Sequence, residues 1–183
     1  MTPVDYSKQL LLQARVLAED EADDDRRQAN LRRSVSATYY AVFHFLVGEA
    51  CRFLIGGGGE AAEVSVPLGR TFSHTDLRKA SELFQKARTD YAGGAMIPKG
   101  KDMPEGLGEM ITVFIELQRR RETADYDLSE SFEKADVRNS VEGAVAAIGG
   151  WGAIRDHQAT RLFLLFCFDM ARMKKERKAE TNP

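Results

Sequence analysis

The chain of 183 residues contains few cysteines, little net charge and no long hydrophobic run. Cys51 and Cys167 lie far apart in apolar segments, which indicates reduced, buried thiols in a cytosolic protein rather than a disulfide framework. A net charge of −2 argues against a general nucleic-acid binder, since such proteins usually carry a basic excess. The longest apolar run, residues 162–168, is much shorter than the ~20 residues that a membrane-spanning helix needs.

Strand signals are also scarce in the sequence. No segment alternates convincingly between apolar and polar residues, and the stretch 63–67 is too short for a sheet. Apolar residues instead recur every three or four positions, which is typical of amphipathic helices. With 43% apolar and 30% charged residues, the composition suits a soluble globular protein with one sizeable core. The helical spacing predicts an all-α protein. The N-terminus carries no secretion signal, so we expect the protein in the cytoplasm.

Turn residues divide the helical pattern into segments. Four glycines at 56–59 end the longest segment, and Ser73 with Asp76 three residues later is a helix-start signal. A Gly/Pro-rich connection at 93–106 and the stretch 124–132 are expected as loops. The helices are predicted, in chain order, at about 6–17, 26–54, 73–87, 107–123, 132–148 and 153–178.

Such helices predict an up-and-down antiparallel helical bundle. We expect residues 1–150 to form the bundle, with four or five helices, and residues 151–183 to form an extra C-terminal helix packed on the same domain. The sequence "GGWG" at 149–152 is expected to break the chain between the two parts, because glycine is a poor helix former. The basic end at 172–180 is expected as a solvated tail.

The segment "RSVSATYYAVFH" places four residues on one helix face. Arg33, Ala37, Tyr40 and His44 are spaced by four, three and four positions, as on adjacent turns. This line of cation, phenol and imidazole could bind an anion or a nucleotide. It could also be the edge of a buried helix, with Tyr40 and His44 half-buried and Arg33 reaching water. The spacing alone favours this structural interpretation and leaves the binding one open.

A second motif is "RRRETADYD", which begins at Arg119. Arginine forks match the geometry of phosphate groups, so Arg119 and Arg121, with Asp125 and Tyr126, are candidates for lining a groove that binds RNA or a nucleotide. The alternative is structural, because cations also stabilise the C-terminal end of a helix.

The two motifs together resemble those of the HEPN domains of bacteria and archaea. The resemblance covers roughly residues 6–148 and includes the order of the helices and the segment "SESFEKADVRNSVEGAVAAI". It implies a bundle of four or five helices that is usually a homodimer. Many HEPN proteins are toxins encoded beside a small nucleotidyltransferase that serves as the antitoxin. The resemblance implies neither a metal nor a cofactor.

Nuclease members of this family carry an arginine, a histidine after four intervening residues, and a tyrosine two positions further on. In this sequence Arg119 and Tyr126 match the outer positions, and Ala124 takes the place of the histidine. Alanine cannot transfer a proton, and general acid–base assistance is typically worth ~10²–10⁴ in rate. His44, on the facing helix, is the candidate to replace the missing imidazole.

Three functions follow as hypotheses. The first is an RNA- or nucleotide-binding component of a toxin–antitoxin or defence pair, with weak or no nuclease activity. The second is a metal-independent ribonuclease that uses His44, and the third is a non-catalytic protein-interaction bundle. The residues assigned to catalysis are His44, Arg119 and Tyr126, and those assigned to ligand binding are Arg33, Tyr40, Arg121 and Asp125. The histidines have no metal-ligand spacing, so no metal site is expected, and His74 is expected at the surface.

Overall fold

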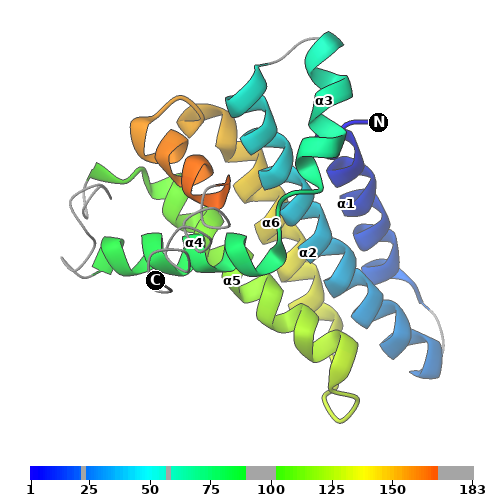
Figure 1. The fold of residues 1–183 in the computed structure, drawn as a ribbon. Coiled ribbons are helices and arrows are strands. Elements are labelled where there is room, and N and C mark those ends of the chain that lie inside the picture. The colour runs from blue at the N-terminus through cyan, green and yellow to red at the C-terminus, as the bar shows by residue number, and fades with distance from the viewer. Residues whose placement is uncertain (22–23, 57–58, 90–101, 169–183) are drawn as a thin grey trace, which may run out of the picture.

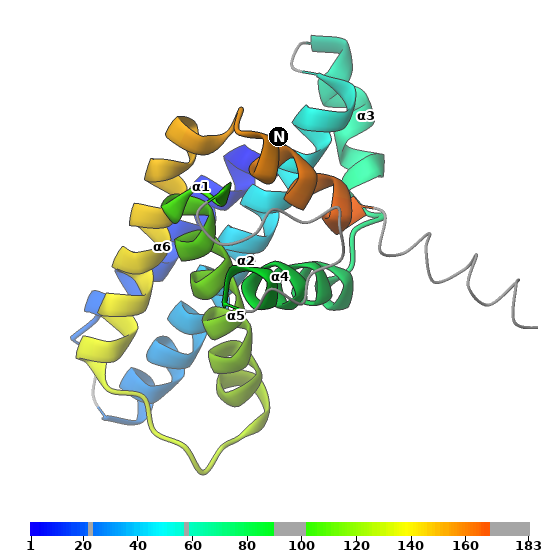
Figure 2. The ribbon, with the colours of Figure 1, turned by 90° about the vertical axis from the view of Figure 1, so that its left-hand side faces the viewer.

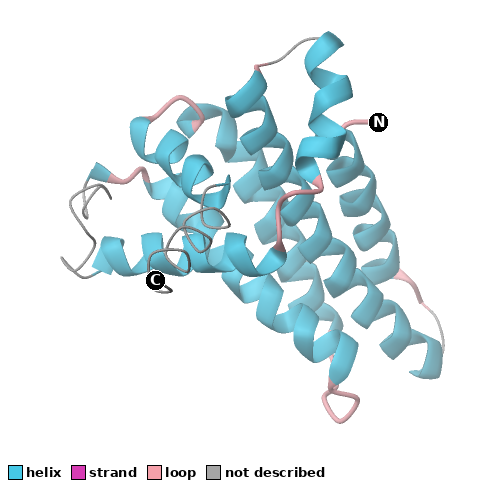
Figure 3. Cartoon of the chain, viewed as in Figure 1, coloured by secondary structure: helices cyan, strands magenta, loops and turns pink. Residues whose placement is uncertain are grey.

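The computed structural model describes residues 1–21, 24–56, 59–89 and 102–168. Every regular element within these ranges is a helix, which confirms the predicted all-α fold (Figure 3). The helices are α1 (Pro3–Glu19), α2 (Asp24–Ile55), α3 (Gly59–Gly69), α4 (His74–Thr89), α5 (Glu105–Tyr126), α6 (Lys134–Ile154) and a last helical segment over 158–168. Among the described residues, no helix combines the length and the apolar character that crossing a membrane requires.

The bundle is formed by α1, α2, α5 and α6, which lie side by side with their chain directions alternating (Figure 1). The long helix α2 contacts each of the other three helices of the bundle, and α3 packs on its C-terminal half. Helix α4 lies across α5. The segment 158–168 covers α4, where the rings of Phe84 and Phe163 are 5.3 Å apart (Figure 2).

Side-chain caps explain where two of the helices begin. Thr2 accepts a hydrogen bond from the backbone N–H of Asp5, and the Asp5 carboxylate accepts one from the backbone N–H of Thr2, so the pair forms a capping box at the start of α1. Ser73 accepts a hydrogen bond from the backbone N–H of Asp76 at the start of α4, as its sequence signal predicts.

The core contains the apolar stripe that the sequence predicts for α2. Leu31, Val35, Tyr39, Val42 and Leu46 are all buried there. Tyr39, Val42 and Leu46 belong to the main cluster, which also takes in Phe84, Phe114, Trp151 and Phe163; Leu31 and Val35 belong to a smaller one. Both cysteines are buried and free, as expected.

Helix α3 was not expected from the sequence. Its composition, with glycines at both ends and Pro67 inside, is unfavourable for a helix. Packing against α2 offsets this, because Ser65 is buried and its carbonyl accepts a hydrogen bond from the Cys51 thiol at 3.6 Å. Gly56, at φ +80°, ends α2 in the left-handed conformation that glycine adopts easily.

Two predicted helix ends were wrong. Helix α6 continues through "GGWG" to Ile154, because Trp151 is fully buried and its indole N–H donates to the Glu49 carboxylate at 2.8 Å. Helix α5 continues through Tyr126, so residues 124–126 are helical rather than part of a loop. Most of the connection at 93–106 and the end of the predicted last helix lie outside the described residues.

Replacing Glu49 should destabilise the fold, because this buried carboxylate joins α2 to the end of α6. It accepts hydrogen bonds from Trp151 and, at 2.7 and 3.0 Å, from Arg155. We expect Glu49→Leu to lower the free energy of unfolding by about 2–4 kcal/mol in urea titrations, since the indole N–H and a partly buried guanidinium lose their acceptor.

The control for this experiment is Glu142→Ala, which removes the exposed ion pair between α6 and Arg15. It should cost less than about 1 kcal/mol. Equal losses in the two variants would contradict a special role for Glu49.

Candidate functional site

Residues of α2 and α5 meet in a set that we call the arginine cluster: Ser36, Tyr40, Arg121, Asp125 and Tyr126. The Arg121 guanidinium lies 2.6 Å from the Asp125 carboxylate through Nε, and one Nη donates to the Tyr40 hydroxyl at 3.1 Å. The Ser36 hydroxyl donates to the other oxygen of Asp125 at 2.6 Å. Two independent sequence motifs are therefore brought together on adjacent helices.

Aromatic rings flank the guanidinium at the centre of the arginine cluster. Its carbon lies 5.6 Å from the centroid of the Tyr40 ring and 5.5 Å from that of Tyr126. Burial alone would lower the pKa of Arg121, but Asp125 and the tyrosines outweigh it and the pKa is raised. Arg121 is therefore a fixed cation, and its side chain is still 23% exposed to solvent.

Arg32, which lies outside both sequence motifs, holds the end of α5 in place. Its guanidinium donates to the carbonyls of Ala124 and Asp127 at 2.9 and 3.0 Å, and also to the Glu130 carbonyl. These are carbonyls at or just beyond the end of α5, where helical partners run out. In the sequence, the feature that could have indicated this role is an arginine within the otherwise largely buried part of α2.

The other predicted site residues lie apart from this cluster. Arg33 and Arg119 are exposed, and among the described residues no hydrogen bond or ion pair joins their guanidinium groups to the cluster. His44 is half-buried, with its ring 4.9 Å from that of Tyr6 and 5.3 Å from that of Phe43. The structure thus joins Tyr40, Arg121, Asp125 and Tyr126 but not all seven candidates.

His74, rather than His44, is the imidazole beside the arginine cluster. The sequence places His74 at the surface, but the residue is half-buried. Its ring is 5.7 Å from that of Tyr40. Its Nδ1 lies 2.7 Å from the Tyr39 hydroxyl. Burial raises the pKa of Tyr39, which keeps this phenol protonated and able to donate to His74.

Both imidazoles line one hollow of about 330 Å³, which we call the histidine pocket. Its other walls include Tyr6, Phe43 and Phe72. Burial is the main cause that lowers the pKa of each histidine; the second cause is His74 for His44, and Arg121 for His74. The two rings are therefore neutral at pH 7. Among the described residues, no group of three histidine, cysteine, aspartate or glutamate side chains could hold a metal ion.

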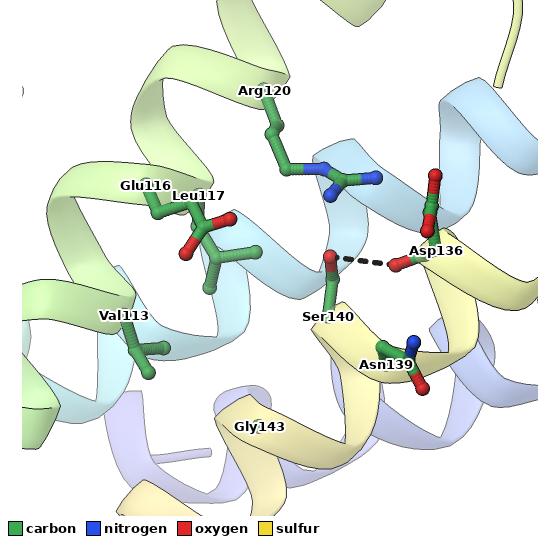
Figure 4. Close-up of a pocket in the computed structure, with 8 residues that line it drawn as sticks. All are labelled: Val113, Glu116, Leu117, Arg120, Asp136, Asn139, Ser140 and Gly143. Carbon is green, nitrogen blue, oxygen red and sulfur yellow. Dashed lines mark hydrogen bonds between the residues drawn. The ribbon is translucent and has the colours of Figure 1, made fainter.

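A separate hollow lies on the opposite flank of α5, facing α6. Figure 4 shows Arg120 reaching across it from α5 toward Asp136, Asn139 and Ser140 on α6. The consecutive arginines of the second motif therefore have different surroundings.

Comparison with known proteins gave no match to a family model, a curated protein or a solved structure. The resemblance to HEPN domains therefore stays a prediction that depends on the two motifs.

The histidine pocket predicts a loss of stability in mild acid. The unfolded chain takes up protons near the ordinary histidine pKa of about 6.5, whereas the folded pKa values of His44 and His74 are lower. Protonation therefore favours the unfolded state, and the free energy of unfolding should fall as the pH drops from about 7 to 5. In urea titrations across this range, His44→Phe should decline less steeply than the wild type. An unchanged decline in the variant would contradict this account.

Proposed function

We propose that this protein binds RNA or a nucleotide through the arginine cluster, without efficient cleavage. The observation that carries the proposal is the position of Arg121, which Tyr40 and Asp125 hold in one orientation between two aromatic rings. A cation fixed in this way binds a phosphate without losing further side-chain entropy. Asp125 neutralises part of its charge, so additional cations are needed for useful affinity.

Two exposed arginines supply that additional charge. Arg119 lies seven positions before Tyr126 on α5, and Arg33 lies seven positions before Tyr40 on α2, so each shares a helix face with a member of the cluster. Exposed arginines on the helices that carry a fixed one are suited to the phosphates of a chain rather than to a single ion. This local charge reconciles phosphate binding with a net charge of −2 for the whole chain.

Tyr126 supplies a surface for a base. It is 74% exposed at the last position of α5, with its ring near Arg121. Large exposed aromatic side chains next to cations are typical of sites that bind single-stranded nucleic acids, where bases stack on the ring.

The position that holds the histidine in HEPN nucleases supports binding without cleavage. Ala124 is buried in a small apolar cluster with Leu31, Val35 and Phe132. It has no group that transfers protons, and His44 contacts Tyr6 and Phe43 instead of the cluster. We therefore propose a HEPN-like member of a toxin–antitoxin or defence pair with weak or no nuclease activity. A homodimer and a nucleotidyltransferase antitoxin are the partners that this proposal implies.

Removing Arg119 should weaken RNA binding while leaving the fold intact. We expect Arg119→Ala to lower the affinity for a labelled single-stranded RNA in fluorescence anisotropy, and to reduce the slope of log affinity against log salt concentration by about 1. The melting temperature should stay nearly unchanged because the side chain is exposed. The matched control is Arg15→Ala, an exposed arginine of α1 that pairs with Glu142. Equal losses in the two variants would contradict the proposed site.

Replacing Tyr126 tests the stacking surface separately. Tyr126→Ala should cost about 1–3 kcal/mol of RNA binding free energy without changing the salt slope, because a ring that stacks on a base carries no charge. A variant that binds RNA as tightly as the wild type would remove Tyr126 from the site. If the wild type binds neither RNA nor nucleotides but does bind a protein partner tightly, the interaction-bundle hypothesis would replace this proposal.

Cleavage is tested by incubating the purified protein with RNA in EDTA. We expect no cleavage above that of a His44→Ala control. Cleavage by the wild type that is absent in His44→Ala would contradict the non-catalytic proposal and favour the ribonuclease hypothesis.

A further inference from the structure

The hollow between α5 and α6, which we call the α5–α6 pocket, has a volume of about 220 Å³. It is lined mainly by polar and charged side chains on two packed helices of the bundle (Figure 4). Those that matter here are Glu116, Arg120, Asp136, Asn139 and Ser140, with Gly143 on the α6 side. Neither sequence motif predicts a site between α5 and α6.

Arg120 is the least satisfied charged group of this pocket. Its Nε is buried without a hydrogen-bond partner, and no ion pair of the described residues includes its guanidinium. The ring of Phe132, 6.0 Å from the guanidinium carbon, gives it a contact on one side. The buried Nε lacks an acceptor, and Figure 4 shows the guanidinium pointing into the hollow, where a ligand could offer acceptors to its other N–H groups.

The carboxylates determine what the acceptor can be. Glu116 and Asp136 give the pocket two negative charges against the single positive charge of Arg120. A phosphate would be repelled by both carboxylates. A neutral group is favoured if it offers acceptors to the arginine and, on an adjacent edge, N–H donors to a carboxylate.

We propose that the α5–α6 pocket binds a guanine base. Guanine presents O6 and N7 as a pair of acceptors that match the two N–H donors of an arginine fork, here that of Arg120. Its N1–H and N2–H groups lie on the next edge and donate to Glu116 or Asp136. Adenine lacks both the second acceptor and the N1–H donor, so it satisfies fewer of these groups. The apolar side chains of Val113 and Leu117 line the same hollow and give the ring a non-polar contact.

The position of the pocket suits a base of a bound RNA chain. Arg119, Arg120 and Arg121 are consecutive on a helix, so each side chain points ~100° away from the one before it. Arg121 faces α2, Arg120 faces α6, and Arg119 is exposed. The role of the pocket in RNA recognition rests on the proposed function. The pocket would then select guanine at one position of the RNA while the arginine cluster binds the backbone.

The pocket is tested first without any phosphate. Saturation-transfer NMR of the full chain with guanosine, inosine and adenosine should give a strong signal for guanosine and a weak one for adenosine. Inosine, which lacks the N2 amino group, should be intermediate. Guanosine and adenosine signals of equal strength would overturn the proposal, whatever the outcome for RNA.

Two variants and a matched control locate the site. Arg120→Gln removes the fork, and Gly143→Leu fills the pocket; a Cβ at Gly143 meets no atom within 4 Å, so the side chain enters open space. Both should lose the guanosine signal. Arg120→Gln should keep a melting temperature near that of the wild type, and Gly143→Leu should keep or raise it, since glycine is a poor helix former. The control is Gly149→Leu, also in open space on α6 but outside the pocket, and it should keep the signal. A guanosine signal that survives Gly143→Leu would overturn the proposal.

Anisotropy with RNA then separates this inference from the proposed function. The wild type should prefer an oligonucleotide that contains guanine over an all-adenine one by roughly 5- to 100-fold, and Arg120→Gln should abolish the preference but keep binding to the adenine oligonucleotide. Tight binding without base preference would leave the arginine cluster as an RNA site and overturn the guanine pocket. A guanosine signal without any RNA binding would support the guanine pocket and overturn the proposed RNA site.

Discussion

The structure depends on one constraint, which is that the long helix α2 is buried along most of its length and carries polar groups that need partners. A buried polar group without a hydrogen bond is costly, so several such groups on α2 fix the position of a neighbouring element. The partners come from four different helices. They are Ala14 of α1 for Ser34, His74 of α4 for Tyr39, Arg121 and the carbonyl of Ala124 of α5 for Tyr40 and Arg32, and Trp151 of α6 for Glu49.

The same constraint accounts for the candidate site. Tyr40 is half-buried at the edge of α2, where its hydroxyl accepts from Arg121. Arg32, two turns earlier, binds the last carbonyls of α5 and so fixes the helix that carries Arg121 and Tyr126. The site is therefore rigid because it belongs to the contacts that hold the bundle together. Tyr126, its exposed member, and Arg119, which is exposed on the same helix, are available to a ligand.

Much of the fold could be predicted from the sequence, because apolar spacing and helix caps are local signals. The core stripe of α2 and the start of α4 at Ser73 are examples. The ends of α5 and α6 could not be predicted in the same way. Local propensity favours a break at "GGWG", but Trp151 is buried in the core and bonds to Glu49, 102 residues away, and these distant contacts favour a continuous helix.

The candidate site was predictable in part for the same reason. Two motifs far apart in sequence, one with Tyr40 and one with Arg121, were expected on facing helices, and these two residues are in contact. Helical spacing also put His44 on the face of Tyr40, but spacing does not show which histidine a neighbouring element brings closer. His74 is that histidine, because it begins α4 next to the rings of Tyr39 and Tyr40.

The central claim is that the surface formed by α2 and the end of α5 contacts RNA. Photo-crosslinking of the full chain to a single-stranded RNA containing 5-iodouracil, followed by mass spectrometry of the linked peptides, tests it most directly. The account predicts cross-links at Tyr126, the exposed aromatic residue beside Arg121. Cross-links confined to the basic residues 172–178, with none on α2 or α5, would contradict it.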